Sequence, residues 1–313
     1  MQFSWRELKK PFFVLAPMEG ATDTVFRQIV AICGRPDVFF TEFTSVEGLT
    51  SERGFQEVSK RLKYTEKERP LIAQIWGKTP EKYAQSAKIV RDMGFDGVDI
   101  NMGCPDRTVV KNGCCSALIE NPDLAKQIID AVKSEAGELP VSVKTRIGLR
   151  VIKTEEWIEF LLQQNLAALT VHLRTAKEMS KVPPHWDEMK KVLALRDKIS
   201  PSTVIIGNGD LFTLQDAKDK INEYDFDGAM LGRAIFQNPW LFTGKLPEEF
   251  DGPTKLELLK HHLELYENTW GEGKSFYPLK KYFKIYTSGF NGASAFREKL
   301  METNSYAEAK ALL

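Results

Sequence analysis

The 313-residue sequence contains few cysteines, no excess of charge of either sign and no long hydrophobic run. Four cysteines in a chain of this length do not make a disulfide framework, so we expect reduced thiols in the cytoplasm. No apolar stretch approaches the roughly 18 to 20 residues that a membrane-spanning helix needs, and the N-terminus has no signal-peptide pattern. Basic and acidic residues number 43 each, which argues against a nucleic-acid partner unless the charges cluster locally.

Short β-branched or aromatic runs alternate with longer segments of helical period, which indicates βα units and a parallel sheet. The runs expected as strands are FFVLAPM from Phe12, DVFFTEF from Asp37, PLIAQIWG from Pro70, GVDINMG from Gly97, PVSVKTRIG from Pro140, ALTVHLRT from Ala168, TVIIGNGD from Thr203 and GAMLGR from Gly228. Between the third and fourth runs, the spacing predicts a helix that begins at Pro80 and stops at Gly94.

Eight such units in about 240 residues predict a (β/α)8 TIM barrel, an α/β fold, followed by a small C-terminal α-helical domain. A doubly wound parallel sheet is the competing architecture. Such sheets usually have fewer strands and often a glycine-rich first turn, which this sequence lacks.

Polar residues gather at the ends of the expected strands, where TIM barrels place their active sites. They are Met18 with Glu19, Glu42, Gln74, Asn101 with Cys104, Lys144 with Arg146, His172 with Arg174, Asn208 with Asp210, and Gly232 with Arg233. Any one of them could be a solvated side chain, but their occurrence at all eight endings favours an active site. The glycines of the last two endings would let backbone N–H groups approach a phosphate, although tight turns explain them as well.

Seven segments resemble the tRNA-dihydrouridine synthases in order and in spacing. They are LAPMEGATDTVFR, TEF, DINMGCPDRTVVKNG, PVSVKTRIG, TVHLRT, IIGNGD and AMLGRAIFQNPWLF, and a looser similarity follows over SGFNGASAFREKL. The resemblance implies an FMN-binding catalytic barrel over residues 1–243 and a helical tRNA-binding domain over residues 244–313. It also implies reduction of particular uridines in tRNA with NADPH as reductant, and we expect a monomer without a metal.

The resemblance implies roles for the residues at the other seven endings, though not for Glu42. The residues that would line the FMN ring or bond its polar edge are Pro17, Met18, Glu19, Gln74 and Lys144. The residues that would lie against the cofactor or hold its ribityl phosphate are His172, Asn208, Gly209, Asp210, Gly232 and Arg233. Asn101 would face the target base, and Arg146 and Arg174 are expected to contact the substrate.

Cys104 matches the catalytic cysteine of that family. Saturating the C5–C6 bond of uracil requires a hydride at C6 and a proton at C5, and a thiol with an ordinary pKa of ~8.5 stays protonated at neutral pH. We therefore expect Cys104 to be the proton donor without activation, with a structural thiol as the alternative. A metal site is disfavoured, because Cys104, Cys114 and Cys115 lack Cys-x-x-Cys spacing. Cys114 and Cys115 replace the small residues usual in the family, and we expect them to pack.

Beyond Gly244 the strand pattern stops and the chain is predicted to be helical. Residues 274–299 contain six basic residues and one acid among several aromatics, which predicts an RNA-facing patch at Lys280, Lys281 and Lys284. The apolar residues at helical spacing, expected to be core, are Leu279, Tyr282, Phe283 and Tyr286. The lysines could then be a solvated helix face, which is compatible with phosphate contacts.

The sequence therefore predicts a flavin-dependent tRNA-dihydrouridine synthase. An RNA-binding barrel without redox activity is one alternative. A barrel that acts on a free pyrimidine, as dihydroorotate dehydrogenases do, is the other, and the basic tail argues against it because a small substrate gives a second domain less to do.

Overall fold

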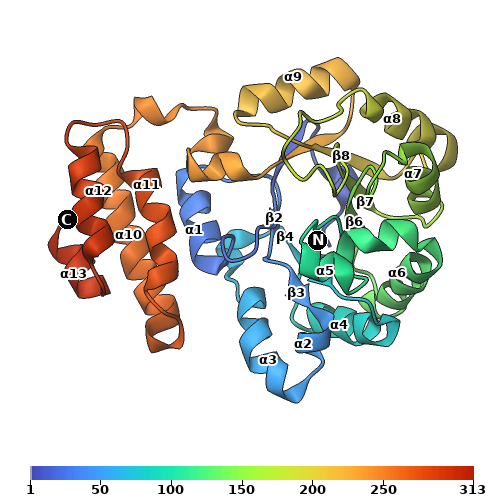
Figure 1. Ribbon diagram of the computed structural model, residues 1–313, viewed down its shortest axis with the longest axis horizontal. Coiled ribbons are helices and arrows are strands. Elements are labelled where there is room, and N and C mark those ends of the chain that lie inside the picture. The colour runs from blue at the N-terminus through green and yellow to red at the C-terminus, as the bar shows by residue number, and fades with distance from the viewer. Residues whose placement is uncertain (1) are drawn as a thin grey trace.

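The computed structural model describes residues 2–313, which form a ring of parallel strands surrounded by helices, with a helical bundle on one side (Figure 1). The strands of the ring are β1 (Phe12–Leu15), β2 (Phe39–Phe40), β4 (Leu71–Trp76), β5 (Gly97–Met102), β6 (Val141–Arg146), β7 (Ala168–His172), β8 (Val204–Asn208) and β9 (Gly228–Leu231). They pair in the order β1-β9-β8-β7-β6-β5-β4-β2, and a parallel bridge from Val14 to Val38 joins the two ends. The predicted TIM barrel is confirmed.

The second expected strand, over residues 37–43, is shorter than predicted. Only β2 forms within it, and a separate short strand, β3 (Thr44–Ser45), follows it and pairs with β4. Between them the Thr41 hydroxyl accepts the Gln74 N–H at 3.1 Å and donates to the Glu42 carbonyl at 2.7 Å. The Thr41 side chain thus takes a hydrogen bond from β4 that a strand carbonyl would otherwise accept. The prediction of one continuous strand is wrong.

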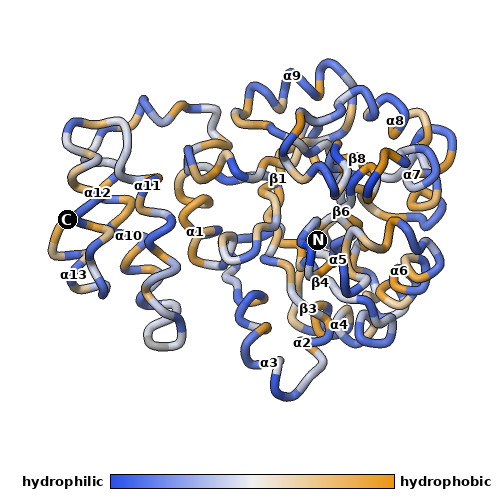
Figure 2. The backbone as a smooth tube through the Cα atoms, viewed as in Figure 1, coloured by the Kyte–Doolittle hydropathy of each residue, from blue (hydrophilic) through white to orange (hydrophobic). Residues whose placement is uncertain are grey.

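Helices cover the outside of the ring, and an apolar plug fills its amino end. The outer helices are α1 (Thr24–Cys33), α4 (Pro80–Asp92), α6 (Pro122–Ala136), α7 (Thr154–Leu162), α8 (Glu188–Ile199) and α9 (Leu214–Tyr224). The short helix α3 (Glu52–Val58) packs on α2 (Val46–Leu49). Helix α4 begins at Pro80 as predicted, and the chain turns away at Gly94, which has a φ of 78°. Helix α3 buries no residue and is mostly hydrophilic in Figure 2. Trp5 closes the barrel interior by packing against Phe12 and Phe40.

The tail forms a bundle that packs on α1. Its helices are α10 (Gly252–Trp270), α11 (Phe283–Tyr286), α12 (Ala293–Glu302) and α13 (Tyr306–Ala311). A 3-10 turn over Tyr277–Tyr282 precedes α11, so this stretch is not one continuous helix. The predicted apolar residues of the stretch are nevertheless all buried, at positions 279, 282, 283 and 286.

Aromatic stacking and polar contacts join the bundle to the barrel. Tyr282 stacks on Phe26 of α1 with ring centroids 4.6 Å apart, and its hydroxyl donates to the Ala21 carbonyl. Lys274 pairs with Asp23, the N-cap residue of α1, at 2.8 Å. Within residues 2–313, no helix is both long enough and apolar enough to cross a membrane.

Candidate active site

The register of the barrel aligns the predicted site residues across neighbouring strands. Asn101 of β5 lies opposite Lys144 of β6, and Arg146 lies opposite His172 of β7. His172 in turn lies opposite Asn208 of β8. Because all strands run in one direction, these side chains meet at one end of the barrel.

A cavity of about 310 Å³ opens at these strand ends. The predicted site residues that line it are Pro17, Met18, Lys144, Arg146, His172, Asn208, Gly209, Asp210, Gly232 and Arg233. Lining residues that the sequence did not suggest include Pro105, Met179 and Phe212, which come from loops beyond the strand ends. The structure therefore brings together most of the cofactor residues that the resemblance implied.

Lys144 and His172 give the cavity floor its electrostatic character. The Lys144 ammonium donates no hydrogen bond to any described residue, and burial, aided by the charge of Arg146, lowers its pKa to about 8. Burial and the neighbouring cations hold the pKa of His172 well below its usual range, so its imidazole is neutral. The floor thus presents a half-buried donor without an acceptor among the described residues.

One side wall is a cradle of glycines and guanidinium groups. Gly209 has a φ of 145°, and a Cβ there would lie 3.0 Å from Pro184. Asp210, with a φ of 45°, accepts hydrogen bonds from Arg174 Nη1 at 3.0 Å and Arg233 Nη2 at 2.8 Å. These hydrogen bonds lower the pKa of Asp210, and the hydrogen bond from Arg174 has the largest effect. The wall combines an open backbone with positive charge, which suits a phosphate.

Two predicted contact residues lie elsewhere. Arg174 was expected at the substrate, but its side chain is only 1% exposed and binds Asp210 and the Val182 carbonyl, so it supports the cradle from behind. Glu19 was expected against the cofactor ring, but it lies outside the cavity and pairs with Arg61 at 2.6 Å.

Gln74 and Asn101 belong to a buried polar network beneath the cavity. Asn101 Nδ2 donates to Gln74 Oε1 at 2.9 Å, and Gln74 Nε2 donates to Asp99 at 2.7 Å. Burial raises the pKa of Asp99 to about 6, and the Ser142 hydroxyl donates to it at 2.6 Å. Sequence reasoning missed Asp99, although an acid inside an otherwise apolar strand is a signal of such a network. The oxygen of Asn101 accepts the N–H groups of Gly103 and Cys104, each at 3.0 Å, so the network fixes the cysteine loop.

Cys104 is partly exposed and directly precedes Pro105 of the cavity wall. A hydrogen bond from the Cys115 thiol lowers the pKa of Cys104 to about 7 against the opposing effect of burial, with help from the Asp106 N–H and Arg146. The expectation of an ordinary thiol is therefore wrong. The reason is a second cysteine, Cys115, which is fully buried and has a left-handed backbone φ of 52°. Cys115 is fully buried and Cys114 is buried, as predicted for packing residues.

The three tail lysines do not form one free patch. Lys280 is half-buried, and its ammonium donates to the Met301 carbonyl at 2.8 Å. Lys281 and Lys284 are exposed. The ammonium of Lys281 would lie 3.8 Å from a Cβ on Gly20, so it reaches the barrel beside the segment that lines the cavity.

Within residues 2–313, no three His, Cys, Asp or Glu side chains are grouped so that they could hold a metal ion. A closed parallel barrel with a cavity at the carboxyl ends of its strands places the protein in the TIM-barrel class, whose active sites lie at this end of the barrel. Comparison with known proteins identifies the family within that class.

The family model described as dihydrouridine synthase matches residues 14–313. A probable tRNA-dihydrouridine synthase of Staphylococcus aureus (strain COL) is 46% identical over 311 residues, which cover 99% of this chain and 94% of the relative. Probable tRNA-dihydrouridine synthase 2 of Bacillus subtilis (strain 168) is 47% identical, with 99% and 95% covered. The chain belongs to the dihydrouridine synthase family. Because dihydrouridine forms from uridine by reduction, the protein is an oxidoreductase.

Solved structures support the barrel architecture. The old yellow enzyme homologue from Zymomonas mobilis superposes with a TM-score of 0.52 at 12% identity, covering 76% of this chain and 89% of that one. Morphinone reductase in complex with tetrahydroNAD gives a TM-score of 0.51 at 14% identity, with 75% and 88% covered. At these identities the similarity establishes the fold alone.

Proposed function

We propose that the protein is a flavin-dependent tRNA-dihydrouridine synthase that binds FMN in the strand-end cavity, takes hydride from NADPH and uses Cys104 as the proton donor. The observation that carries the proposal is the adjacency of the cavity and the cysteine loop. Pro105, which follows the thiol, is part of the cavity wall. The names of the curated relatives support tRNA as the substrate. The proposal includes a monomer in the cytoplasm.

The cavity fits FMN in its chemistry. The cradle of Gly209, Gly232 and Arg233 would hold the phosphate, and the Lys144 ammonium supplies a donor for the polar edge of the ring. A neutral His172 can lie against the ring without adding charge. When bound, the flavin supplies the hydride for C6 of the uracil.

The residues of the chain supply the proton. Uridine would have to leave its RNA stack to reach the cavity, as targets of base-modifying enzymes do. Asn101 fixes the backbone of Cys104, whose thiol would protonate C5. The resulting thiolate is stabilised by the Cys115 hydrogen bond and the nearby Arg146 charge. An acid whose pKa lies near the working pH both holds its proton and releases it readily.

The test is to purify the protein and follow its two half-reactions. The protein should be yellow and should release FMN rather than FAD. NADPH should bleach the flavin without oxygen, and unmodified tRNA should restore the colour with formation of dihydrouridine, measured by mass spectrometry. Free uridine should restore it far more slowly. Colourless protein that cannot be reconstituted with FMN would refute the proposal, and an equal response to free uridine would favour a pyrimidine enzyme.

A further inference from the structure

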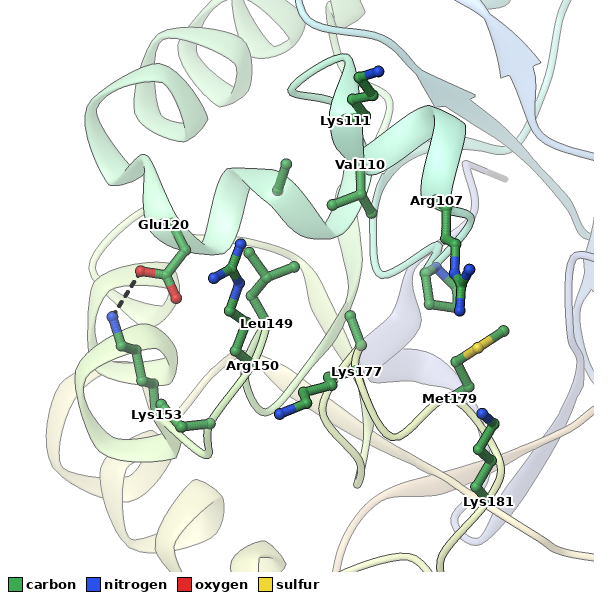
Figure 3. Close-up of a pocket in the computed structure, with 14 residues that line it drawn as sticks. Arg107, Val110, Lys111, Glu120, Leu149, Arg150, Lys153, Lys177, Met179 and Lys181 are labelled. Carbon is green, nitrogen blue, oxygen red and sulfur yellow. Dashed lines mark hydrogen bonds and ion pairs between the residues drawn. The ribbon is translucent and has the colours of Figure 1, made fainter.

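A second and larger hollow of about 1150 Å³ lies beside the cofactor cavity (Figure 3). It is bounded by α5 (Arg107–Lys111), by the loop that follows β6 and by the loop that follows β7. Pro105 and Met179 line both the hollow and the cavity. The two spaces are therefore neighbours across a shared wall, and neither the family match nor the predicted site assigns the larger one.

The charges around this hollow are almost all positive. Six basic side chains line it: Arg107, Lys111, Arg150, Lys153, Lys177 and Lys181. The one acid in the lining, Glu120, is paired with Lys153 at 2.9 Å. None of the other five cations forms an ion pair with a described residue. Figure 3 shows that the cations come from separate segments on different sides of the hollow.

The floor of the hollow is apolar. It includes Val110, Leu149, Ala176 and Met179, and the Met179 side chain is 39% exposed at a backbone φ of 53°. Unpaired cations around an apolar floor suit a ligand that carries both phosphates and flat rings.

We infer that this hollow holds the phosphate-bearing part of NADPH, the proposed hydride donor. This inference rests on the proposed function. A hydride donor must place its nicotinamide in the cofactor cavity, and the shared wall at Pro105 and Met179 lets one ligand span both spaces. Cations on several sides can surround a pyrophosphate and a 2′-phosphate, whereas an RNA helix would meet them from one side only. The free cations also favour the dinucleotide that carries the extra phosphate.

The experiment compares two triple variants of the flavin-loaded enzyme. Lys111→Gln, Lys177→Gln and Lys181→Gln remove three charges from the hollow. Lys88→Gln, Lys198→Gln and Lys218→Gln remove three exposed lysines from the outer helices as the matched control. Flavin bleaching by NADPH and by NADH is followed in an oxygen-free stopped-flow instrument, and tRNA binding is measured on the same proteins.

The hollow variant should bind NADPH roughly tenfold or more weakly, because each charge-assisted hydrogen bond to a phosphate is worth about a factor of ten. Binding of NADH should weaken less, the limiting bleaching rate should stay constant, and the control should match the wild type. Unchanged NADPH binding with weakened tRNA binding would make the hollow an RNA surface and overturn the inference. Unchanged binding of both would overturn it as well. Failure of NADPH to bleach the wild-type flavin would instead refute the proposed reductant, and the inference with it.

Discussion

At Cys104, the acidity of the thiol depends on a neighbour that is also a cysteine. The Cys115 hydrogen bond outweighs the effect of burial and lowers the pKa of Cys104 to about 7. Burial and the same interaction raise the pKa of Cys115 well above its usual value, so Cys115 remains a donor. The pKa of one thiol therefore lies near neutral pH, while the other thiol stays protonated.

Replacing Cys104 by alanine should separate the two half-reactions. Cys104→Ala keeps the cavity walls, so it should bind FMN and be bleached by NADPH at the wild-type rate. Uridine reduction should fall by ~10²–10⁴, the usual contribution of general acid catalysis. Single-turnover measurements of dihydrouridine formation check this result, and a matching loss of flavin reduction would indicate a structural role instead.

Replacing Cys115 by alanine should change the acidity of Cys104 without removing it. The Cys115→Ala variant lacks the hydrogen bond that stabilises the thiolate, so the pKa of Cys104 should rise from about 7 towards 9. The pH midpoint of iodoacetamide alkylation of Cys104 should shift upward. Cys114→Ala serves as the control, since Cys114 forms no hydrogen bond with Cys104. Identical midpoints in all three proteins would show that the two sulfurs do not interact.

At the scale of elements, the segment from Tyr277 to Tyr286 divides its lysines between two roles. Lys280 is held inside the tail by the Met301 carbonyl and by the Tyr277 ring, 5.0 Å away. Lys281 and Lys284 are exposed, and Lys281 points to the barrel mouth near Gly20. Any phosphate contacts from this segment would come from the latter two.

The double variant Lys281→Gln and Lys284→Gln should weaken tRNA binding. Its logarithmic salt slope should decrease by roughly 0.7 to 0.9 for each lysine–phosphate pair that the substitutions remove. Filter-binding titrations at several salt concentrations measure both quantities. Lys280→Gln is the comparison variant, and it should leave the salt slope unchanged while lowering thermal stability. If the double variant also keeps the wild-type slope, these lysines form only a solvated face.

The strand pattern was predictable, and the contacts between loops were not. Strands of a parallel barrel are covered on both faces, so they appear in the sequence as apolar runs such as LIAQIW. The break after Phe40 depends on a threonine hydroxyl that takes a backbone hydrogen bond, which no run of residue types reveals. The thiol pair depends on a left-handed turn at Cys115, and the burial of Arg174 depends on where Asp210 points. These features arise only when distant segments meet.

At the scale of the whole molecule, the tail and the barrel share one interface. Phe26 of α1 stacks on Tyr282, and His262 of α10 lies beside both, with Nδ1 at 2.7 Å from the Tyr286 hydroxyl. His262 is fully buried, which lowers its pKa to about 3. The histidine is therefore neutral in the folded protein at every pH at which the protein would work.

Acid should destabilise the protein in part through His262. The unfolded chain protonates this residue below pH 6.5 and the folded chain does not, so stability is lost as pH falls from about 6.5 towards 3. Between pH 7.5 and 5.5 the loss should be about 1 kcal/mol. Urea unfolding of His262→Gln at both pH values should lack this part of the pH dependence, whereas His261→Gln, an exposed neighbour, should retain it. Equal pH dependence in His262→Gln and the wild type would contradict the assignment.

The ring of strands is closed unevenly. Strands β6 and β7 pair over five residues, whereas β1 meets the segment before β2 through two backbone hydrogen bonds, Leu15 N–H to Val38 and Asp37 N–H to Phe13. Local opening costs least where few hydrogen bonds must break, so we expect the barrel to open transiently between β1 and the segment before β2. Pro17 and Met18 of the cavity wall follow β1 directly. A ligand that contacts these two residues and the opposite wall of the cavity would therefore hold the two weakly paired edges together. Closure of the barrel would then depend in part on the bound ligand.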